Sequence, residues 1–225
     1  MNYKSALNNK IFAIISKASQ ELNIESYVIG GFVRDLILQR DFKKDIDIVA
    51  VGSGIELALK VADLLPNKPK VQVFKNYGTA MLRFEDTEIE FVGARKESYQ
   101  FESRNPVVEN GTLEDDQNRR DFTINALALS LNSKTYGDLL DPFNGLKDIE
   151  NRTIKTPLNP DITFSDDPLR MLRAVRFANQ LGFDIEDTSL QSITQNKDRI
   201  GIISGERIVD ELNKILATET PSIGF

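Results

Sequence analysis

The chain has 225 residues, with 28 Lys and Arg against 34 Asp and Glu, so its formal net charge is −6. It contains neither Cys nor His, which excludes disulfides, thiolate or imidazole metal ligands, and mechanisms that need a Cys nucleophile or a His base. Any catalysis therefore uses carboxylates, Arg, Lys, Tyr, hydroxyls or backbone amides, and any metal is a hard cation such as Mg²⁺. No apolar run approaches ~20 residues and the first ten residues are polar, so we expect a cytoplasmic protein with no membrane partner.

The first part of the chain mixes helical and strand patterns, separated by short clusters of turn residues. In chain order the patterns predict a helix at 2–22, a strand at 27–29, a helix at 32–39, a strand at 45–51, a helix at 55–65 and strands at 71–74, 79–84 and 88–92. Residues 93–118 are polar and lack periodicity, which predicts a long loop. Residues 122–131 return to helical spacing.

Beyond about residue 150 the patterns are helical only. Asp166, Asp167 and Pro168 are typical of a helix start, and this helix is expected to end at Gly182. Another helix is expected to begin near Gly205. The sequence therefore predicts a mixed α/β domain over residues 1–150, followed by an all-helical domain over residues 151–225.

Three acidic residues lie on predicted strands. Asp45 and Asp47 are two positions apart, so both side chains point to one face of their strand, about 7 Å apart along it. Glu90 lies in the middle of a later apolar strand, where a carboxylate is costly unless it is paired or binds a metal. The three are candidate catalytic residues, with Asp45 and Asp47 as metal ligands. Taken singly, each also fits an exposed strand edge.

Gly30 and Gly31 join a predicted strand to a predicted helix just before the acidic strand. Paired glycines let backbone N–H groups approach a phosphate closely, and Arg34 follows as a further donor. The alternative is a plain tight turn, with Arg34 and Asp35 as a surface ion pair.

Arginines and acids gather in two further segments. Residues 119–126, RRDFTINA, place Arg120 and Asp121 at an expected helix start, which suits anion or ribose recognition or simple capping. In the helix after residue 167, charges recur every third residue, so an acid and an arginine lie one turn apart. Such a pair can read the edge of a base, although a surface ion pair is the alternative. The residues of this second group are Asp167, Arg170, Arg173 and Arg176.

In this order the motifs strongly resemble those of the class II nucleotidyltransferases related to DNA polymerase β, the branch that contains bacterial tRNA CCA-adding enzymes and bacterial poly(A) polymerases. The resemblance runs from about residue 24 to 216 and rests on GGFVRD at 30–35, DID at 45–47, RRDFTINA at 119–126, DPFNG at 141–145, DDPLR at 166–170 and ERI at 206–208. It implies a polymerase β-like head with a mixed sheet over residues 1–150 and an all-helical neck over residues 151–225. The family continues into body and tail domains, so we expect a longer protein.

The resemblance also implies roles for single residues. Asp45 and Asp47 match the family's metal-binding acids, and Glu90 looks like its third carboxylate. Asp167 and Arg170 match the pair that reads the base in place of a template. The full set of implied nucleotide-binding residues is Gly30, Gly31, Arg34, Arg120, Asp121, Asp167, Arg170, Arg173 and Arg176. Asp166 departs from the family pattern, which usually has Glu there.

The implied function is template-independent addition of CMP and AMP, from CTP and ATP, to the 3′ end of tRNA or another RNA, with Mg²⁺ as cofactor. In the implied two-metal mechanism the RNA 3′-hydroxyl attacks the α-phosphate in line. Poly(A) polymerase and A-only addition remain open because those enzymes share the motifs. The segment at 93–118 looks full length for the family, which disfavours CC-only addition. A non-catalytic nucleotide- or RNA-binding module, a structural domain and a small-molecule nucleotidyltransferase are the further alternatives.

Overall fold

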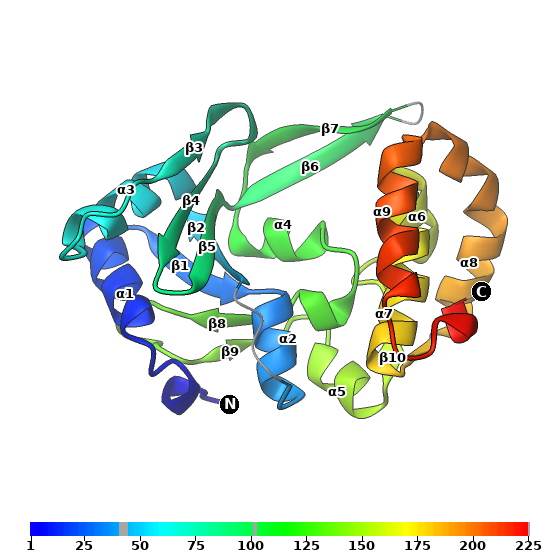
Figure 1. Ribbon diagram of the computed structural model, residues 1–225, viewed down its shortest axis with the longest axis horizontal. Helices are drawn as coiled ribbons and strands as arrows, with labels where there is room; N and C mark the ends of the chain where they lie inside the picture. The colour runs from blue at the N-terminus through cyan, green and yellow to red at the C-terminus, as the bar shows by residue number, and fades with distance from the viewer. Residues whose placement is uncertain (41–44, 101–102, 225) are drawn as a thin grey trace. The chain divides into compact units, whose positions relative to one another are not determined.

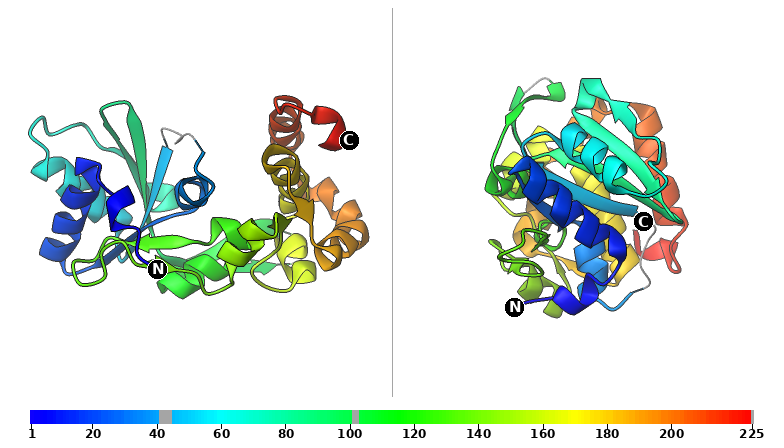
Figure 2. Two further views of the ribbon diagram at one scale, coloured as in Figure 1. Left: turned by 90° about the horizontal axis from the view of Figure 1, so that it is seen from below. Right: turned by 90° about the vertical axis from the view of Figure 1, so that its left-hand side faces the viewer.

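The computed structural model describes residues 1–40, 45–100 and 103–224. Its contacts divide the chain into two compact units, which interleave along the sequence (Figures 1 and 2). The first unit contains residues 1–96, 109–117 and 127–142, and the second contains residues 97–108, 118–126 and 143–225. No helix among the described residues has the length and apolar character needed to cross a bilayer.

The first unit is built on a mixed sheet of seven strands in the order β3-β4-β5-β2-β1-β8-β9, in which only β2 and β5 pair in parallel. Its elements are η1 (Lys4–Ala6), α1 (Lys10–Leu22), β1 (Glu25–Ile29), α2 (Gly31–Ile37), β2 (Asp45–Val51), α3 (Gly54–Leu64), β3 (Gln72–Phe74), η2 (Lys75–Tyr77), β4 (Thr79–Phe84), β5 (Thr87–Gly93), β8 (Ala128–Ser130) and β9 (Leu139–Leu140). The five strands predicted before residue 93 are confirmed. The first helix begins at Lys10 rather than near residue 2, because the Asn9 side chain caps it by accepting from the Ile11 N–H.

One face of this sheet is covered by helices over its central strands. Helix α3 packs on β2, β4 and β5, and α1 packs on α3 and β1 (Figure 1). The side chains under these helices are apolar and less than 5 % exposed; they include Ile46, Ile48, Leu82, Ile89 and Phe91. Burial of these alternating residues forces the intervening ones onto the opposite face, because side chains alternate along a strand.

The opposite face is covered over only part of its area. There Tyr27, Ile29, Val49 and Ala128 pack with Leu113 of helix α4 (Leu113–Asn118). The register places Asp47 directly between Ile29 of β1 and Glu90 of β5, on this same face. The acidic residues therefore lie where the apolar cover ends.

Two sequence-based predictions are wrong. The long loop predicted at 93–118 contains β6 (Arg95–Gln100), β7 (Ser103–Asn110) and α4, and β6 pairs with β7 as a two-stranded ribbon (Figure 1). Val107 and Val108 on this ribbon are both at least half exposed, so no buried face imposes an alternating pattern.

The helix predicted at 122–131 is also absent. Its place is taken by η3 (Thr123–Asn125) and by β8, which pairs with β1. Residues 121–131 are all buried, and a segment that is buried on every side carries no period by which helix and strand can be told apart.

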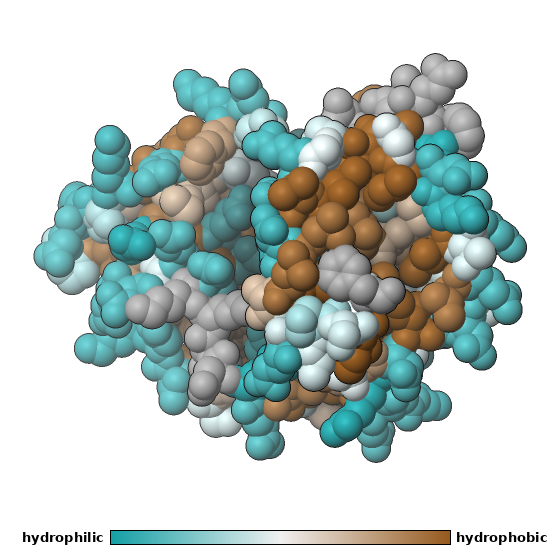
Figure 3. All heavy atoms as spheres, turned by 45° about the vertical axis from the view of Figure 1, so that its right-hand side comes forward, coloured by the Kyte–Doolittle hydropathy of each residue, from teal (hydrophilic) through white to brown (hydrophobic). Residues whose placement is uncertain are grey.

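The second unit is mainly helical. Its remaining elements are α5 (Gly145–Glu150), β10 (Thr153–Ile154), α6 (Pro160–Asp166), α7 (Leu169–Leu181), β11 (Asp184–Ile185), α8 (Asp187–Asn196), η4 (Lys197–Ile202), α9 (Gly205–Leu216) and η5 (Pro221–Gly224). Helix α7 ends at Gly182 as predicted, with Gly182 in the left-handed region (φ 67°), but it starts at Leu169, since Asp166 closes α6. Exposed apolar side chains gather on this unit (Figure 3), among them Val209 and Leu216 of α9.

Candidate active site

The three predicted catalytic carboxylates lie on two neighbouring strands of the first unit. Asp45 and Asp47 are on β2, where Asp45 is exposed and Asp47 is partly buried. Glu90 is the register partner of Asp47 on β5, and Glu88 is the partner of Asp45. Because paired residues point to the same face, the structure brings Asp47 and Glu90 together on the open side of the sheet.

The electrostatics of Glu90 reflect this placement. Partial removal from water raises the pKa of Glu90, and the negative charge of Asp47 raises it further. A hydrogen bond with the Thr79 side chain and the charge of Arg95 act in the opposite direction. The fold thus holds like charges close together, an arrangement typical of sites that recruit a cation.

The donor set fits a hard divalent cation, since it consists of carboxylate oxygens only. Among the described residues, no group of three or more acidic side chains is arranged as a ready metal site. Mg²⁺ beside phosphates is usually held by one or two carboxylates and completed by water and substrate phosphates. Asp45 and Asp47 share one face of β2 and could supply such carboxylates.

The glycine pair ends β1, the strand beside Asp47. Gly30 has φ 81° and ψ −135°, a conformation that in practice only glycine adopts. A Cβ added at Gly31 would meet nothing closer than the Arg34 guanidinium, at 3.6 Å. Arg34 is buried, and its guanidinium donates to both oxygens of Asp35 at 2.8 and 3.0 Å. The ion pair that was the alternative interpretation of Arg34 and Asp35 therefore exists, but in the interior rather than on the surface.

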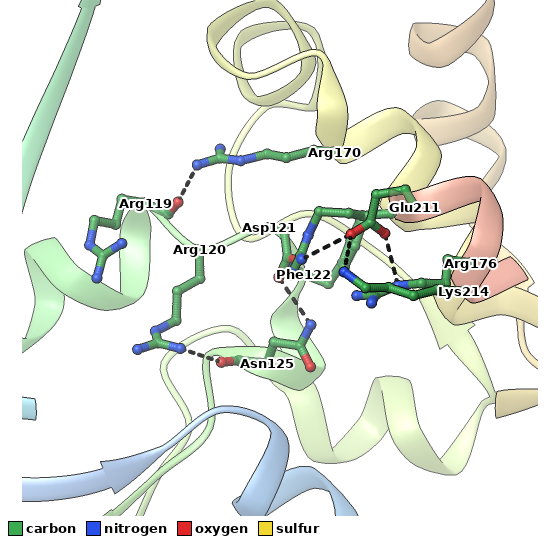
Figure 4. A network of polar contacts seen from close by, with 10 residues as sticks. Arg119, Arg120, Asp121, Phe122, Asn125, Arg170, Arg176, Glu211 and Lys214 are labelled. Carbon is green, nitrogen blue, oxygen red and sulfur yellow. Dashed lines mark hydrogen bonds and ion pairs between the residues drawn. The ribbon is translucent and has the colours of Figure 1, made fainter. Parts of the chain in front are cut away.

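In the second unit, Asp121 is the centre of a polar network (Figure 4). Its buried carboxylate accepts from the Phe122 N–H at 2.8 Å, from Asn125 Nδ2 at 3.0 Å, and from Arg173 through both Nε and a terminal nitrogen. Burial alone would raise the pKa of Asp121, but the Arg173 guanidinium and the Asn125 hydrogen bond lower it to about 2. In this state Asp121 is ionised and its hydrogen-bonding capacity is taken up by protein groups.

The stripe of arginines on α7 is held by acids. Arg176 pairs with Glu211 of α9 at 3.0 Å, and its guanidinium stacks on the Phe177 ring with 4.2 Å to the centroid. Lys214 also pairs with Glu211 at 3.0 Å, and Arg173 approaches it at 4.0 Å. Glu211 is almost fully buried, so its carboxylate joins α9 to two arginines of α7, with Lys214 of its own helix as a third cation (Figure 4).

The predicted base-reading pair lies at the start of α7. The Asp167 side chain accepts from the N–H of Leu169, the first residue of α7, at 3.3 Å. Arg170 is buried and donates to the Arg119 carbonyl at 2.6 Å, while the Arg119 side chain pairs with Glu97 at 3.3 Å. Figure 4 shows Arg170 directed toward Arg119.

Arg120 donates to the Asn125 carbonyl at 3.4 Å. Asp166, just before Asp167, is half-buried, and burial raises its pKa against the charges of Arg170 and Arg199.

The sequence does not single out Glu211, Lys214 or Asn125, which the structure places in this network. Glu211 occupies the apolar stripe of α9 between Ile208 and Ile215, and an acid at such a position is a recognisable sign of a buried ion pair. Asn125 lies within the 119–126 motif, but no local pattern indicates that its side chain donates to Asp121.

The chain is similar to known proteins along most of its length. Residues 26–155, more than half of the chain, match the family described as Poly A polymerase head domain, and residues 182–225 match the probable RNA and SrmB-binding site of polymerase A. The A-adding tRNA nucleotidyltransferase of Aquifex aeolicus is 37% identical over 86% of this chain and 23% of its own length. The CCA-adding enzyme of a Geobacillus species is 37% identical over 90% of this chain and 48% of its own length.

Solved structures show the same relationship. A CCA-adding enzyme in apo form II superposes with a TM-score of 0.90 at 34% identity, covering 100% of this chain and 54% of that one. A tRNA nucleotidyltransferase complexed with a primer tRNA and an incoming ATP analogue superposes with a TM-score of 0.81 at 32% identity, covering 93% and 58%. The chain spans a quarter to a half of the length of these curated relatives. It belongs to the family of the poly A polymerase head domain.

Proposed function

We propose that this chain is the nucleotide-transferring part of an enzyme that adds CMP and AMP from CTP and ATP to the 3′ end of a tRNA, without a nucleic-acid template. The observation that carries the proposal is the placement of Asp45, Asp47 and Glu90 on adjacent strands of an open sheet face. The similarity to tRNA nucleotidyltransferases over most of the chain supports it.

In this proposal each group has a defined task. Asp45 and Asp47 would hold the divalent cation, Mg²⁺, which when bound offsets the charge on the triphosphate and lowers the pKa of the attacking hydroxyl. Glu90 adds a third negative charge beside Asp47. The backbone at Gly30 and Gly31 has the steric freedom to approach phosphates.

Base selection is assigned to Asp167 and Arg170. A carboxylate and a guanidinium one helical turn apart offer an acceptor and a fork of donors, which can match the hydrogen-bonding edge of cytosine or adenine. Arg173 and Asp121 lie in the same unit, and their ion pair holds the backbone of the segment at 119–126 in place.

A second candidate is A-only addition, because the relatives that match at equal identity include A-adding as well as CCA-adding enzymes. Isothermal titration with each of the four ribonucleoside triphosphates in Mg²⁺ separates the two. Binding of CTP and ATP, but not GTP or UTP, is the expected result. Binding of ATP alone would favour A-only or poly(A) addition, and binding of none would refute nucleotide transfer by this chain. Arg170→Ala with unchanged base preference would refute the assigned reader.

A further inference from the structure

The edge of the sheet next to the carboxylates exposes two aromatic rings. Strand β3 is the outermost strand on that side, and it continues directly into η2. Residues 72–78 are exposed without interruption. Phe74 is 42% exposed and Tyr77 is 74% exposed. Burial of an aromatic ring contributes a large favourable free energy. Two exposed rings on one short segment therefore indicate a candidate binding surface.

The register places Phe74 on the same side of the sheet as the carboxylates. Gln72 pairs with Met81 of β4, and Met81 pairs with Glu90. Paired residues share a face and residues two apart on a strand share a face, so Phe74 also faces this side. Glu90 is two strands away from β3, roughly 10 Å at the usual strand spacing.

The charge around this edge contrasts with that of the whole chain. The net charge is −6, yet no Asp or Glu occurs between Asp63 and Glu85. Four cations lie in that interval, of which Lys68 pairs with Asp63 and Arg83 pairs with Glu88. The other two are Lys70 and Lys75, both exposed, and within the described ranges no carboxylate forms an ion pair with either. Exposed aromatic rings interleaved with lysines favour an anionic binding partner that also carries planar groups able to stack on the rings.

A protein strand is the other conceivable partner of an edge, and it fits poorly. β3 has only three residues and ends in the turn of η2. Short, lysine-flanked edges discourage strand addition. Single-stranded nucleic acid fits well, because its bases stack on aromatic rings and its phosphates are attracted by lysines.

We propose that residues 70–78, called here the β3 platform, bind the single-stranded 3′ segment of the RNA that is to be extended. Phe74 and Tyr77 provide stacking surfaces for its bases, and Lys70 and Lys75 contact its phosphates. The inference rests on the proposed function, because it supplies the RNA partner for the same sheet face. The β3 platform would let the first unit bind the RNA whose 3′ end must reach Asp45 and Asp47.

The primary test compares RNA affinity with nucleotide affinity. The probe is a short fluorescein-labelled single-stranded RNA ending in CC, and its binding to the 225-residue chain is followed by fluorescence anisotropy. Phe74→Ala combined with Tyr77→Ala is expected to weaken RNA binding at least roughly 5-fold, the lower end of the range for the loss of stacking on one base. Binding of CTP and ATP, measured by calorimetry, is expected to stay unchanged. The matched control is Leu59→Ala, which trims a 50% exposed apolar residue of α3, the helix over the opposite face.

A second measurement reports stacking directly. The chain contains no Trp, so Tyr77→Trp introduces a single Trp, whose emission can be followed and whose ring keeps an aromatic face at the platform. Quenching of its emission by the RNA is expected, whereas the Leu59→Trp control is expected to show none. Lys70→Gln combined with Lys75→Gln is expected to lower the slope of log affinity against log salt by up to ~0.7 per contact.

The outcomes separate the two proposals. Unchanged RNA affinity in the double alanine variant, equal loss in Leu59→Ala, or no detectable RNA binding by the unsubstituted chain would each overturn the β3 platform. An equal loss for a blunt duplex RNA would also overturn it, because paired bases cannot stack on the rings. Failure of the unsubstituted chain to bind any nucleoside triphosphate would instead count against the proposed function.

Discussion

Replacing the Asp121 carboxylate by an amide tests the polar network of the second unit most directly. Asp121→Asn keeps the size of the side chain and its acceptor oxygen but removes the charge that faces Arg173. In the structure that carboxylate accepts from one backbone N–H, from Asn125 and twice from Arg173. The Asn variant turns one of those contacts into a donor facing a donor.

The size of the effect follows from the pKa of Asp121. A value of about 2, against 3.8 for an unpaired aspartate, corresponds to roughly 2 kcal/mol of stabilisation at neutral pH. Removing one partner of a fully buried pair costs about 3–5 kcal/mol. Arg173 is 33% exposed and has Glu211 at 4.0 Å, so solvent and the second carboxylate offset part of that cost. We expect a loss of about 2–3 kcal/mol, or ~4–12 °C in Tm.

The assay is urea unfolding followed by far-ultraviolet circular dichroism at pH 7, with Asp184→Asn as control. Asp184 is an exposed acid of the same unit, and its substitution is expected to change the free energy of unfolding by less than ~0.5 kcal/mol. An Asp121→Asn variant as stable as the control would refute the conclusion that this carboxylate stabilises the second unit.

The pH dependence gives an independent check. The folded pKa of Asp121 is depressed, so its stabilisation is fully present above about pH 4 and disappears as the pH falls through about 2. The stability difference between the unsubstituted chain and Asp121→Asn should therefore narrow across that acidic window. A difference that stays constant on acidification would mean that the cost comes from packing and not from charge.

Three further predictions follow from single contacts. Asp45→Ala is expected to abolish nucleotide transfer in an extension assay. Because Asp45 is exposed, the Tm is expected to stay within about 1 °C. Normal turnover by this variant would contradict the assignment of Asp45 as a metal ligand. Gly54→Ala is expected to destabilise the first unit by about 1–3 kcal/mol in thermal unfolding, since its Cβ would lie 2.6 Å from the backbone of Val92; an unchanged Tm would show that α3 can shift away from β5. Glu211→Gln is expected to cost about 3 kcal/mol or more, because it leaves Arg176 and its neighbouring cations without their shared charge; denaturant midpoints equal to those of the unsubstituted chain would contradict the bracing of α7 by α9.

Parts of the fold could be predicted because their local patterns are strong. Strands β2, β4 and β5 alternate or run apolar between turn residues, and helix α9 shows a clear apolar stripe. The segments that were predicted wrongly lack a periodic alternation of apolar and polar residues. The β6–β7 ribbon exposes Val107 and Val108 and so lacks a buried face, and the segment at 121–131 is buried throughout.

The candidate site divides in the same way. The period of a strand alone puts Asp45 and Asp47 on one face, and the order of the motifs alone indicates the family. Asp47 and Glu90 are 43 positions apart in the sequence. They become neighbours only because β2 and β5 pair in parallel and in this register. No local pattern encodes that register.

The sequence by itself therefore determined the chemistry that is available: carboxylates without His or Cys, glycines before an acidic strand, and arginines at helical spacing. The tertiary structure decided how those groups are used. It committed Asp121 to Arg173 across 52 positions and joined α7 to α9 through Glu211. It also set Phe74 on the face that carries Glu90. The physical reason is that side-chain identity and short-range period are local properties, whereas ion-pair partners, burial and strand register arise only when distant segments pack together.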